Sequence, residues 1–327
     1  MLGRAQEACD PLLRTVIGWL GEPFATMAGY HLGWWDANGS GNGGSSGKSI
    51  RAALAIAAAA ACGDVTKAAP AAAAVELMHN FSLLHDDVMD RDLIRRGRAT
   101  VWSVWGETNA ILLGDALHAL SGRVLAEFYE PTVAAPALMK LESSCMALCL
   151  GQFEDCNFEA RSTVSPGAYL RMAGGKTASL IGCACALGAL SAGASTSVVQ
   201  AMERFGFQLG VAFQVVDDMM GVWGNAALAG KSVGNDLARR KSTFPVVVAM
   251  NYQSAAAAEL GELYRSTAPM TAADIARATE LVEAAGGRRI AQQCANESIT
   301  AAMEALPDFL HSTELIALAQ FIVDRDW

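Results

Sequence analysis

The sequence predicts an all-α protein, and three observations lead to that class. Alanine dominates the chain, while β-branched and aromatic residues never form the alternating runs that are typical of strands. Hydrophobic residues make up 52% and charged residues 17% of the 327 positions, so a large part of the chain must be buried. No linker is long enough to divide it. We therefore expect a single domain over residues 1–327, a bundle of roughly ten or more helices around a central apolar cavity.

The N-terminal part is expected to form helices that are interrupted by one flexible loop. Residues 6–31 have an amphipathic pattern that breaks near Gly21 and Pro23. A loop rich in glycine, serine and asparagine follows at 38–47. A helix is expected over 48–62, and a second one from about Ala68 to an acidic segment near position 90.

The rest of the chain has the same helical period. Small-residue breaks and proline positions separate the apolar stretches. The expected helices cover 108–129, 134–158, a short stretch from 165, 174–190, a long stretch from about 196, and the region from 246 to 327 with breaks at 268–271, 286–287 and 307.

Charge and hydropathy exclude several classes of protein. A net charge of -9 with scattered basic residues argues against nucleic acid as a partner. The first sixteen residues lack the apolar core of a signal peptide, which predicts a cytoplasmic protein. No stretch of 18 uninterrupted apolar residues occurs, so stable membrane insertion is not expected. The eight cysteines form no CxxC and are interpreted as reduced, buried side chains.

The densest group of charges is the segment 85–100, HDDVMDRDLIRRGRAT. On a helix, Asp86 and Asp90 lie four residues apart on one face, and Asp87 lies about 100° round the axis. Such carboxylates disfavour their own ionised state unless a cation is present. Hard oxygen ligands without histidine or cysteine favour magnesium. Downstream, Arg95 and Arg96 carry guanidinium groups suited to phosphate oxygens, so the segment predicts a magnesium diphosphate site.

A second acidic pair, Asp217 and Asp218, lies next to Gln214 in an apolar helix without a neighbouring basic residue. Burying two bare carboxylates costs several kcal/mol, which again predicts a cation. The two acidic groups are expected to face one cavity of the bundle.

Basic residues at two helix starts are further candidates. Gly47-Lys48-Ser49 suggests a P-loop, but position 42 is Asn42 and no plausible strand precedes it, so we expect Lys48 and Arg51 to offer an anion site at a helix N-terminus. Lys176 and Thr177 open the small-residue helix in the same way. In each case a solvated helix end is the alternative.

The motifs taken together resemble the trans-type isoprenyl diphosphate synthases, also called polyprenyl synthetases. The resemblance rests on Asp-Asp-x-x-Asp at 86–90, Arg95-Arg96-Gly97, Gln214 to Asp218, and Gly230-Lys231 through Pro245, all in the family's order. It covers about residues 30–245. It implies an isoprenoid-synthase-type helical bundle, usually a homodimer, that binds two or three magnesium ions per site and condenses isopentenyl diphosphate with an allylic diphosphate.

The resemblance also implies a role for each matching residue. Magnesium would be held by Asp86, Asp87, Asp90, Asp217 and Asp218. The allylic diphosphate would be contacted by Arg95, Lys176, Thr177 and Lys231, with Gln214 lining that site. Isopentenyl diphosphate would lie against Lys48, Arg51, His79 and Arg96. The catalytic group would comprise the five aspartates with Arg95 and Lys176.

Product length in this family depends on where the growing tail is stopped. Phe81, five residues before Asp86, is expected to be the floor, whereas Ser82 is small. This predicts C20 geranylgeranyl diphosphate first and a C15 product second. Ordinary core packing is the alternative role for Phe81.

One departure keeps two other functions open. The second motif ends in Gly221, where the family's fuller pattern has a third aspartate. A class I terpene cyclase would use the same bundle on one allylic diphosphate, and a noncatalytic subunit would regulate a partner synthase. The retained Lys48, Arg51, His79 and Arg96 favour condensation, and the intact first acidic group argues against a regulatory subunit.

Overall fold

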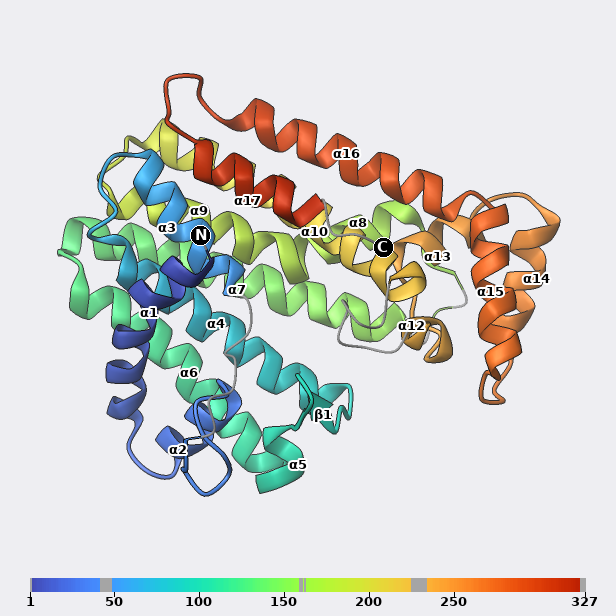
Figure 1. The fold of residues 1–327 in the computed structure, drawn as a ribbon, viewed down its shortest axis with the longest axis horizontal. Helices are drawn as coiled ribbons and strands as arrows, with labels where there is room; N and C mark the ends of the chain where they lie inside the picture. The colour runs from blue at the N-terminus through green and yellow to red at the C-terminus, as the bar shows by residue number, and fades with distance from the viewer. Residues whose placement is uncertain (1, 42–48, 159–160, 162, 225–233, 324–327) are drawn as a thin grey trace. The chain divides into compact units, whose positions relative to one another are not determined.

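The structure is a computed structural model that describes residues 2–41, 49–158, 161, 163–224 and 234–323 (Figure 1). Within these residues the chain is mainly helical and its one sheet is a two-stranded hairpin, which confirms the all-α class. The chain divides into two compact units, which are described separately below. The first unit comprises Met1–Cys145, Cys183–Glu203 and Pro307–Leu315, and the second comprises Met146–Gly182, Arg204–Leu306 and Ile316–Trp327. That residues 1–327 act as one domain stays a prediction.

The first unit is built around one long central helix, α4. It contacts α1, α3, α5 and α6. The elements up to α6 are α1 (Leu2–Ile17), the 3-10 turn η1 (Gly18–Leu20), α2 (Phe24–His31), α3 (Ile50–Ala61), α4 (Ala68–Met89), β1 (Ile94–Arg95), β2 (Arg98–Ala99), α5 (Val101–Trp105) and α6 (Glu107–Phe128). The predicted helices in this region, and the break near Gly21, are confirmed.

Alanine makes the close packing around α4 possible. The alanines at 71–74 on α4 are fully buried, as are Ala55 and Ala58 on α3. Gly188, on α9 (Ser179–Ser191), approaches α3 so closely that an added Cβ would lie 2.0 Å from the Ala55 carbonyl oxygen. Small side chains thus let the helices approach one another at the backbone, so even a methyl group added at Gly188 would force them apart.

The second unit contains the C-terminal parts of two long helices, Pro131–Phe158 and Thr196–Trp223, and most of the other helices in the second half of the chain. Its core gathers Tyr169, Val215, Met219, Phe244 and neighbouring apolar residues. The elements from α7 onward are α7 (Pro131–Phe158), α8 (Pro166–Ala173), the π-helical turn η2 (Gly174–Ala178), α9, α10 (Thr196–Trp223), α12 (Asn235–Ala238), α13 (Phe244–Met250), α14 (Ala255–Arg265), α15 (Ala272–Ala284), α16 (Gly287–Ala305) and α17 (Thr313–Val323). Figure 1 shows α14, α15 and α16 in orange to red.

A tight helix approach fixes the π-helical turn η2 in the second unit. A Cβ on Gly175 would lie 2.6 Å from the Ala147 carbonyl oxygen, and one on Gly151 would lie 2.2 Å from the Lys176 backbone nitrogen. Glycine at both positions therefore allows α7 to pack backbone to backbone against η2. This contact positions Lys176 and Thr177, two of the predicted site residues.

Two described helical stretches are long and apolar enough to cross a membrane by length and composition. They are Pro131–Phe158 and Pro166–Ser191, and 33% and 78% of their apolar windows are buried inside the structure. The core helix of a globular protein meets the same criteria. The absence of stable membrane insertion therefore stays a prediction.

Candidate active site

The first acidic cluster, Asp86, Asp87 and Asp90, lies at the C-terminal end of α4 in the first unit. The Asp90 backbone N–H donates to the Asp86 carbonyl oxygen at 2.8 Å, so the helical turn continues to Asp90. Asp86 and Asp90 therefore share one face of the helix, as predicted, and both are partly exposed. Asp87 lies on a different face and is only 1% exposed.

Asp87 is paired with Arg95 but keeps one oxygen unengaged. Arg95 Nε donates to Asp87 Oδ1 at 2.7 Å. The other oxygen, Oδ2, is buried and has no hydrogen-bond partner among the residues that the structure describes. Burial raises the pKa of the Asp87 carboxyl group, while Arg95 acts in the opposite direction. A buried carboxylate oxygen without a donor is costly, and a cation would satisfy it.

A tight hairpin brings Arg95 back to the helix end. Strands β1 and β2 pair Arg95 with Arg98, and the turn between them has positive φ at Arg96 (52°) and Gly97 (74°). The Arg98 guanidinium donates to the Trp35 carbonyl oxygen at 2.7 Å and lies 4.2 Å from the centre of the Tyr30 ring. Arg98 thus anchors the hairpin, which leaves Arg95 and Arg96 at its turn.

The predicted basic residues of the first unit form one group. The Arg51 guanidinium Nη1 donates to His79 Nε2 at 3.1 Å. Burial, followed by the charges of Arg51, Arg96 and Arg95, holds the pKa of His79 well below its usual range, so the imidazole is neutral and can accept this bond. Burial lowers the pKa of Arg51 to about 10, which still leaves it charged at neutral pH. Three arginines gathered around a neutral imidazole favour an anion.

Two further members of this group were not assigned a role from the sequence. Glu76 is buried on α4 and accepts the Ala52 backbone N–H at 3.1 Å. Burial raises the pKa of its carboxyl group, and the Ala52 hydrogen bond and the charge of Arg51 only partly oppose that rise. His31 on α2 has its pKa lowered to about 3, first by burial and then by Arg96 and Arg95. Glu76 lies three residues before His79 on one helix, and this spacing could have indicated from the sequence that it belongs to the same group. His31 carried no local signal. Lys48 lies outside the described residues.

The second acidic cluster lies on α10 in the second unit, and its two acids differ. Asp217 is exposed, whereas Asp218 is buried. Asp218 Oδ2 accepts the Phe244 backbone N–H at 2.7 Å and the Tyr169 hydroxyl, and Oδ1 accepts Gln214 Nε2 at 2.9 Å. Burial raises the pKa of Asp218 to about 7, and these three donors oppose that rise.

The other predicted residues of the second unit extend this network. The Thr177 hydroxyl donates to Gln214 Oε1 at 2.7 Å, which links η2 to the Asp218 network. Lys176 Nζ lies 2.5 Å from Asp155 Oδ2, near the end of α7. The structure therefore groups Lys176 with Asp155, and Thr177 with Gln214 and Asp218. Lys231 lies outside the described residues.

The donor sets of the two acidic clusters fit a hard divalent cation. All the candidate ligands are carboxylate oxygens, and in the first cluster a buried Asp87 oxygen still needs a partner. Asp86, Asp87 and Asp90 could hold a cation in the first unit, and Asp217 in the second. Asp218 already uses three of about four acceptor positions of its carboxylate.

The residues predicted to set product length lie on α4. The Phe81 ring centre lies 4.8 Å from that of His85 and 5.3 Å from that of His118, a residue of α6. The Ser82 hydroxyl donates to the His79 carbonyl oxygen at 2.8 Å. Phe81 is thus a buried ring in contact with two imidazoles, which suits a chain-length stop and equally a well-packed core residue.

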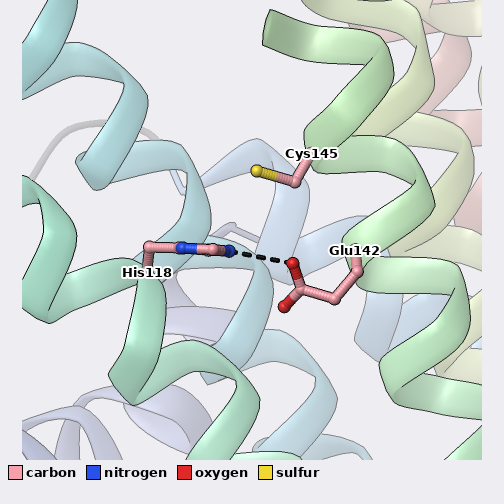
Figure 2. Close-up of side chains that lie close together, drawn as sticks. All are labelled: His118, Glu142 and Cys145. Atoms are coloured by element: carbon pink, nitrogen blue, oxygen red, sulfur yellow. Dashed lines mark hydrogen bonds and ion pairs between the residues drawn. The ribbon is translucent and has the colours of Figure 1, made fainter.

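His118 belongs to another group that the sequence did not single out. His118, Glu142 on α7 and Cys145 bring one ligand atom each within 4.8 Å of one another, and Figure 2 shows the three side chains converging. His118 Nε2 lies 2.9 Å from Glu142 Oε2. Their nitrogen, oxygen and sulfur donors would suit zinc rather than magnesium. Since Glu142 holds the ring that packs on Phe81, the pair also supports Phe81.

The helical fold and the two aspartate-rich helix segments agree with the predicted prenyltransferase class, and comparisons with known proteins identify the family. The polyprenyl synthetase family model matches residues 36–282. The chain therefore belongs to the polyprenyl synthetase family, the trans-isoprenyl diphosphate synthases, which confirms the resemblance seen in its motifs.

Individual relatives agree with this assignment. A geranylgeranyl diphosphate synthase of Mycobacterium tuberculosis is 58% identical over 327 residues, covering 100% of this chain and 93% of the relative. A (2E,6E)-farnesyl diphosphate synthase of Mycobacterium bovis is 42% identical, covering 99% and 92%. The crystal structure of a polyprenyl synthetase from Streptomyces coelicolor A3(2) matches with a TM-score of 0.93 and 40% identity, covering 98% of both chains.

Proposed function

We propose that this prenyltransferase condenses isopentenyl diphosphate with an allylic diphosphate to make C20 geranylgeranyl diphosphate. One observation carries the proposal for two substrates: Arg51 and His79 are hydrogen-bonded to each other, and the positive charge of Arg96 acts on both. This basic group suits isopentenyl diphosphate, the substrate whose diphosphate does not leave during the reaction. The higher identity to a geranylgeranyl than to a farnesyl synthase supports the C20 product, with C15 as the second choice.

Each residue set has a role in the proposed reaction. Arg51, His79 and Arg96, with Lys48, bind isopentenyl diphosphate. Arg95, Lys176, Thr177 and Lys231 bind the allylic diphosphate, and Gln214 lines that site. Two or three magnesium ions, held by Asp86, Asp87, Asp90, Asp217 and Asp218, would neutralise the charge that develops on the departing diphosphate.

The chemistry requires a dry, cationic environment. The allylic carbon–oxygen bond breaks, and the diphosphate leaves with the electron pair. The alkene of isopentenyl diphosphate then attacks the allylic carbon, and a new carbon–carbon bond forms, which leaves a cationic carbon in the isopentenyl unit. The carbon next to this cationic centre loses a proton to the released diphosphate, and a new double bond forms. Arginine side chains orient both diphosphates by bidentate hydrogen bonds. The apolar helix faces exclude water, which would otherwise capture the allylic cation.

One assay separates condensation from its two alternatives. Purified protein with magnesium and geranyl or farnesyl diphosphate is incubated with and without isopentenyl diphosphate, and the products are identified. A longer diphosphate that forms only with both substrates supports the proposal. Hydrocarbon from the allylic substrate alone would instead identify a terpene cyclase, and activity only after a partner synthase is added would identify a regulatory subunit.

Phe81 is proposed to stop the growing chain. Replacing Phe81 with Ala removes the ring between His85 and His118, so the tail should extend and products longer than C20 should appear. The matched control is Phe205→Ala, which removes a fully buried phenylalanine elsewhere. Each truncation is expected to cost about 3–5 kcal/mol in the free energy of unfolding, so both are assayed well below their unfolding temperatures. An unchanged product profile in the Phe81 variant, or the same shift in both variants, would reject this role.

The protein is further proposed to be a cytoplasmic homodimer. One face of α7 supports self-association, because Met139, Met146, Leu150 and Phe153 are all more than 60% exposed and recur at helical spacing. Sedimentation velocity would test the dimer, with Met146→Glu expected to shift the protein toward monomer. A monomeric wild-type protein would contradict it. Cell fractionation would test the location.

A further inference from the structure

The second acidic cluster has Gly221 where the family's fuller pattern has a third aspartate, and this position lies on the same helix face as Asp217. Asp217 and Gly221 lie four residues apart on α10 and therefore share one face of the helix. In the first cluster the same spacing joins Asp86 and Asp90, which both carry carboxylates. At Gly221 the helix itself offers no ligand.

The space beside Gly221 is occupied by the carboxylate of Asp236. A Cβ built on Gly221 would lie 2.1 Å from Asp236 Oδ2, 3.1 Å from its Cγ and 3.6 Å from its Cβ. The order of these distances shows that the carboxylate end of Asp236, and not its backbone, meets Gly221. Asp236 comes from α12, which is separate from α10. Any residue other than glycine at position 221 would require this carboxylate to move.

We propose that Asp236 supplies the carboxylate that the second acidic cluster lacks at position 221, and that glycine at 221 is what admits it. Asp217 and Asp236 then form the acid pair that residues four positions apart, such as Asp86 and Asp90, form in the first cluster. Asp218 is poorly suited to that task, since three donors already engage its carboxylate. The inference rests on the proposed function, in which the second cluster binds magnesium together with a diphosphate.

A purely structural role for Asp236 makes a different prediction. Asp236 lies in the first turn of α12, where an acid can stabilise the helix start. A structural acid would have to stay at position 236. A ligand can be moved to position 221 on α10, provided that Asp236 is removed to make room.

The experiment therefore uses a swap. Asp236→Ala, Gly221→Ala and the double variant Gly221→Asp with Asp236→Ala are compared with the wild type. Magnesium affinity in the presence of inorganic pyrophosphate is measured by calorimetry, alongside chain-elongation activity. Gly261→Ala on α14 is the matched control, because its new Cβ would meet its nearest neighbour at an ordinary 3.5 Å. Alanine also favours a helix interior over glycine, so Gly221→Ala should fold.

Asp236→Ala and Gly221→Ala should each weaken magnesium affinity by about tenfold or more, since the first removes the ligand and the second displaces it. The swap should recover to within about threefold of the wild type, and Gly261→Ala should be unchanged. Unchanged affinity in Asp236→Ala, or a swap no better than Asp236→Ala alone, would overturn the proposal.

A separate variant distinguishes failure of this inference from failure of the proposed function. If Asp217→Asn loses magnesium affinity and Asp236→Ala does not, the second cluster binds the cation and only the role of Asp236 is wrong. If the wild type binds no magnesium with pyrophosphate and does not elongate chains, the proposed function fails, and this inference fails with it.

Discussion

The two acidic clusters each bury one aspartate, but they stabilise it by different means. Asp87 in the first cluster faces a cation, Arg95, and keeps one buried oxygen unpaired within the described part of the chain. Asp218 in the second cluster faces three neutral donors that use both of its oxygens. Neither acid could be buried bare, because an uncompensated carboxylate costs several kcal/mol.

This difference separates an acid with an unengaged buried oxygen from one whose carboxylate is mostly occupied by donors of the protein. Asp87 connects α4 to the short hairpin that carries Arg95. Asp218 connects α8, α10 and the start of α13 through Tyr169, Gln214 and Phe244. Removing Asp87 should therefore damage catalysis first, and removing Asp218 should damage stability first.

The largest expected effect is on the activity of Asp87→Asn. The amide still accepts the Arg95 hydrogen bond, but it removes the charge and weakens the buried oxygen as a ligand. We expect kcat to fall by about 10²–10³-fold, while the free energy of unfolding changes by no more than about 1 kcal/mol. Steady-state kinetics and chemical denaturation check the two parts. A variant that is mainly unstable would show that Asp87 does the same structural work as Asp218.

The next effect is on the stability of Asp218→Ala. Three donors, the Tyr169 hydroxyl, the Gln214 amide and the Phe244 backbone N–H, lose their common acceptor in a buried region. Since each unsatisfied buried donor costs about 1–3 kcal/mol, we expect a loss of about 3 kcal/mol or more in the free energy of unfolding. Tyr169→Phe removes one of these bonds only, so it should cost about 1 kcal/mol. Equal losses in the two variants would contradict the shared network.

Local patterns were sufficient to predict most helices from the sequence. The period of apolar residues predicted α4 and α10, and proline and glycine positions predicted the starts of α8 and α16. The same spacing placed Asp86 and Asp90 on one face of α4. These features depend on residues within one or two helical turns of one another, so no knowledge of distant contacts was needed.

The partners of the buried groups could not be predicted in this way. Asp218 meets Tyr169 and Phe244, which are 49 and 26 residues away along the chain. His31 joins the basic group from α2, and Asp236 reaches Gly221 from another helix. Cysteine burial was also predicted too generally, because Cys149 and Cys156 are exposed. Such contacts depend on how helices pack, and a lone residue of the right chemistry gives no sign of its partner.

The smallest effect is expected at the ion pair between Lys176 and Asp155, which is more exposed than the pair between Arg95 and Asp87. Lys176 Nζ lies 2.5 Å from Asp155 Oδ2, but the two side chains are 23% and 36% exposed, whereas the Asp87 side chain bound by Arg95 is 2% exposed. A pair that solvent reaches contributes about 0–1 kcal/mol, so Asp155→Asn should change KM for the allylic diphosphate by at most about fivefold, with kcat unchanged. Freeing Lys176 from its acidic partner should lower KM. Because salt screens exposed charges, the change should shrink as ionic strength rises. A large, salt-independent change in kcat would mean that Asp155 acts on the reaction directly, and the two clusters would then differ less than their burial indicates.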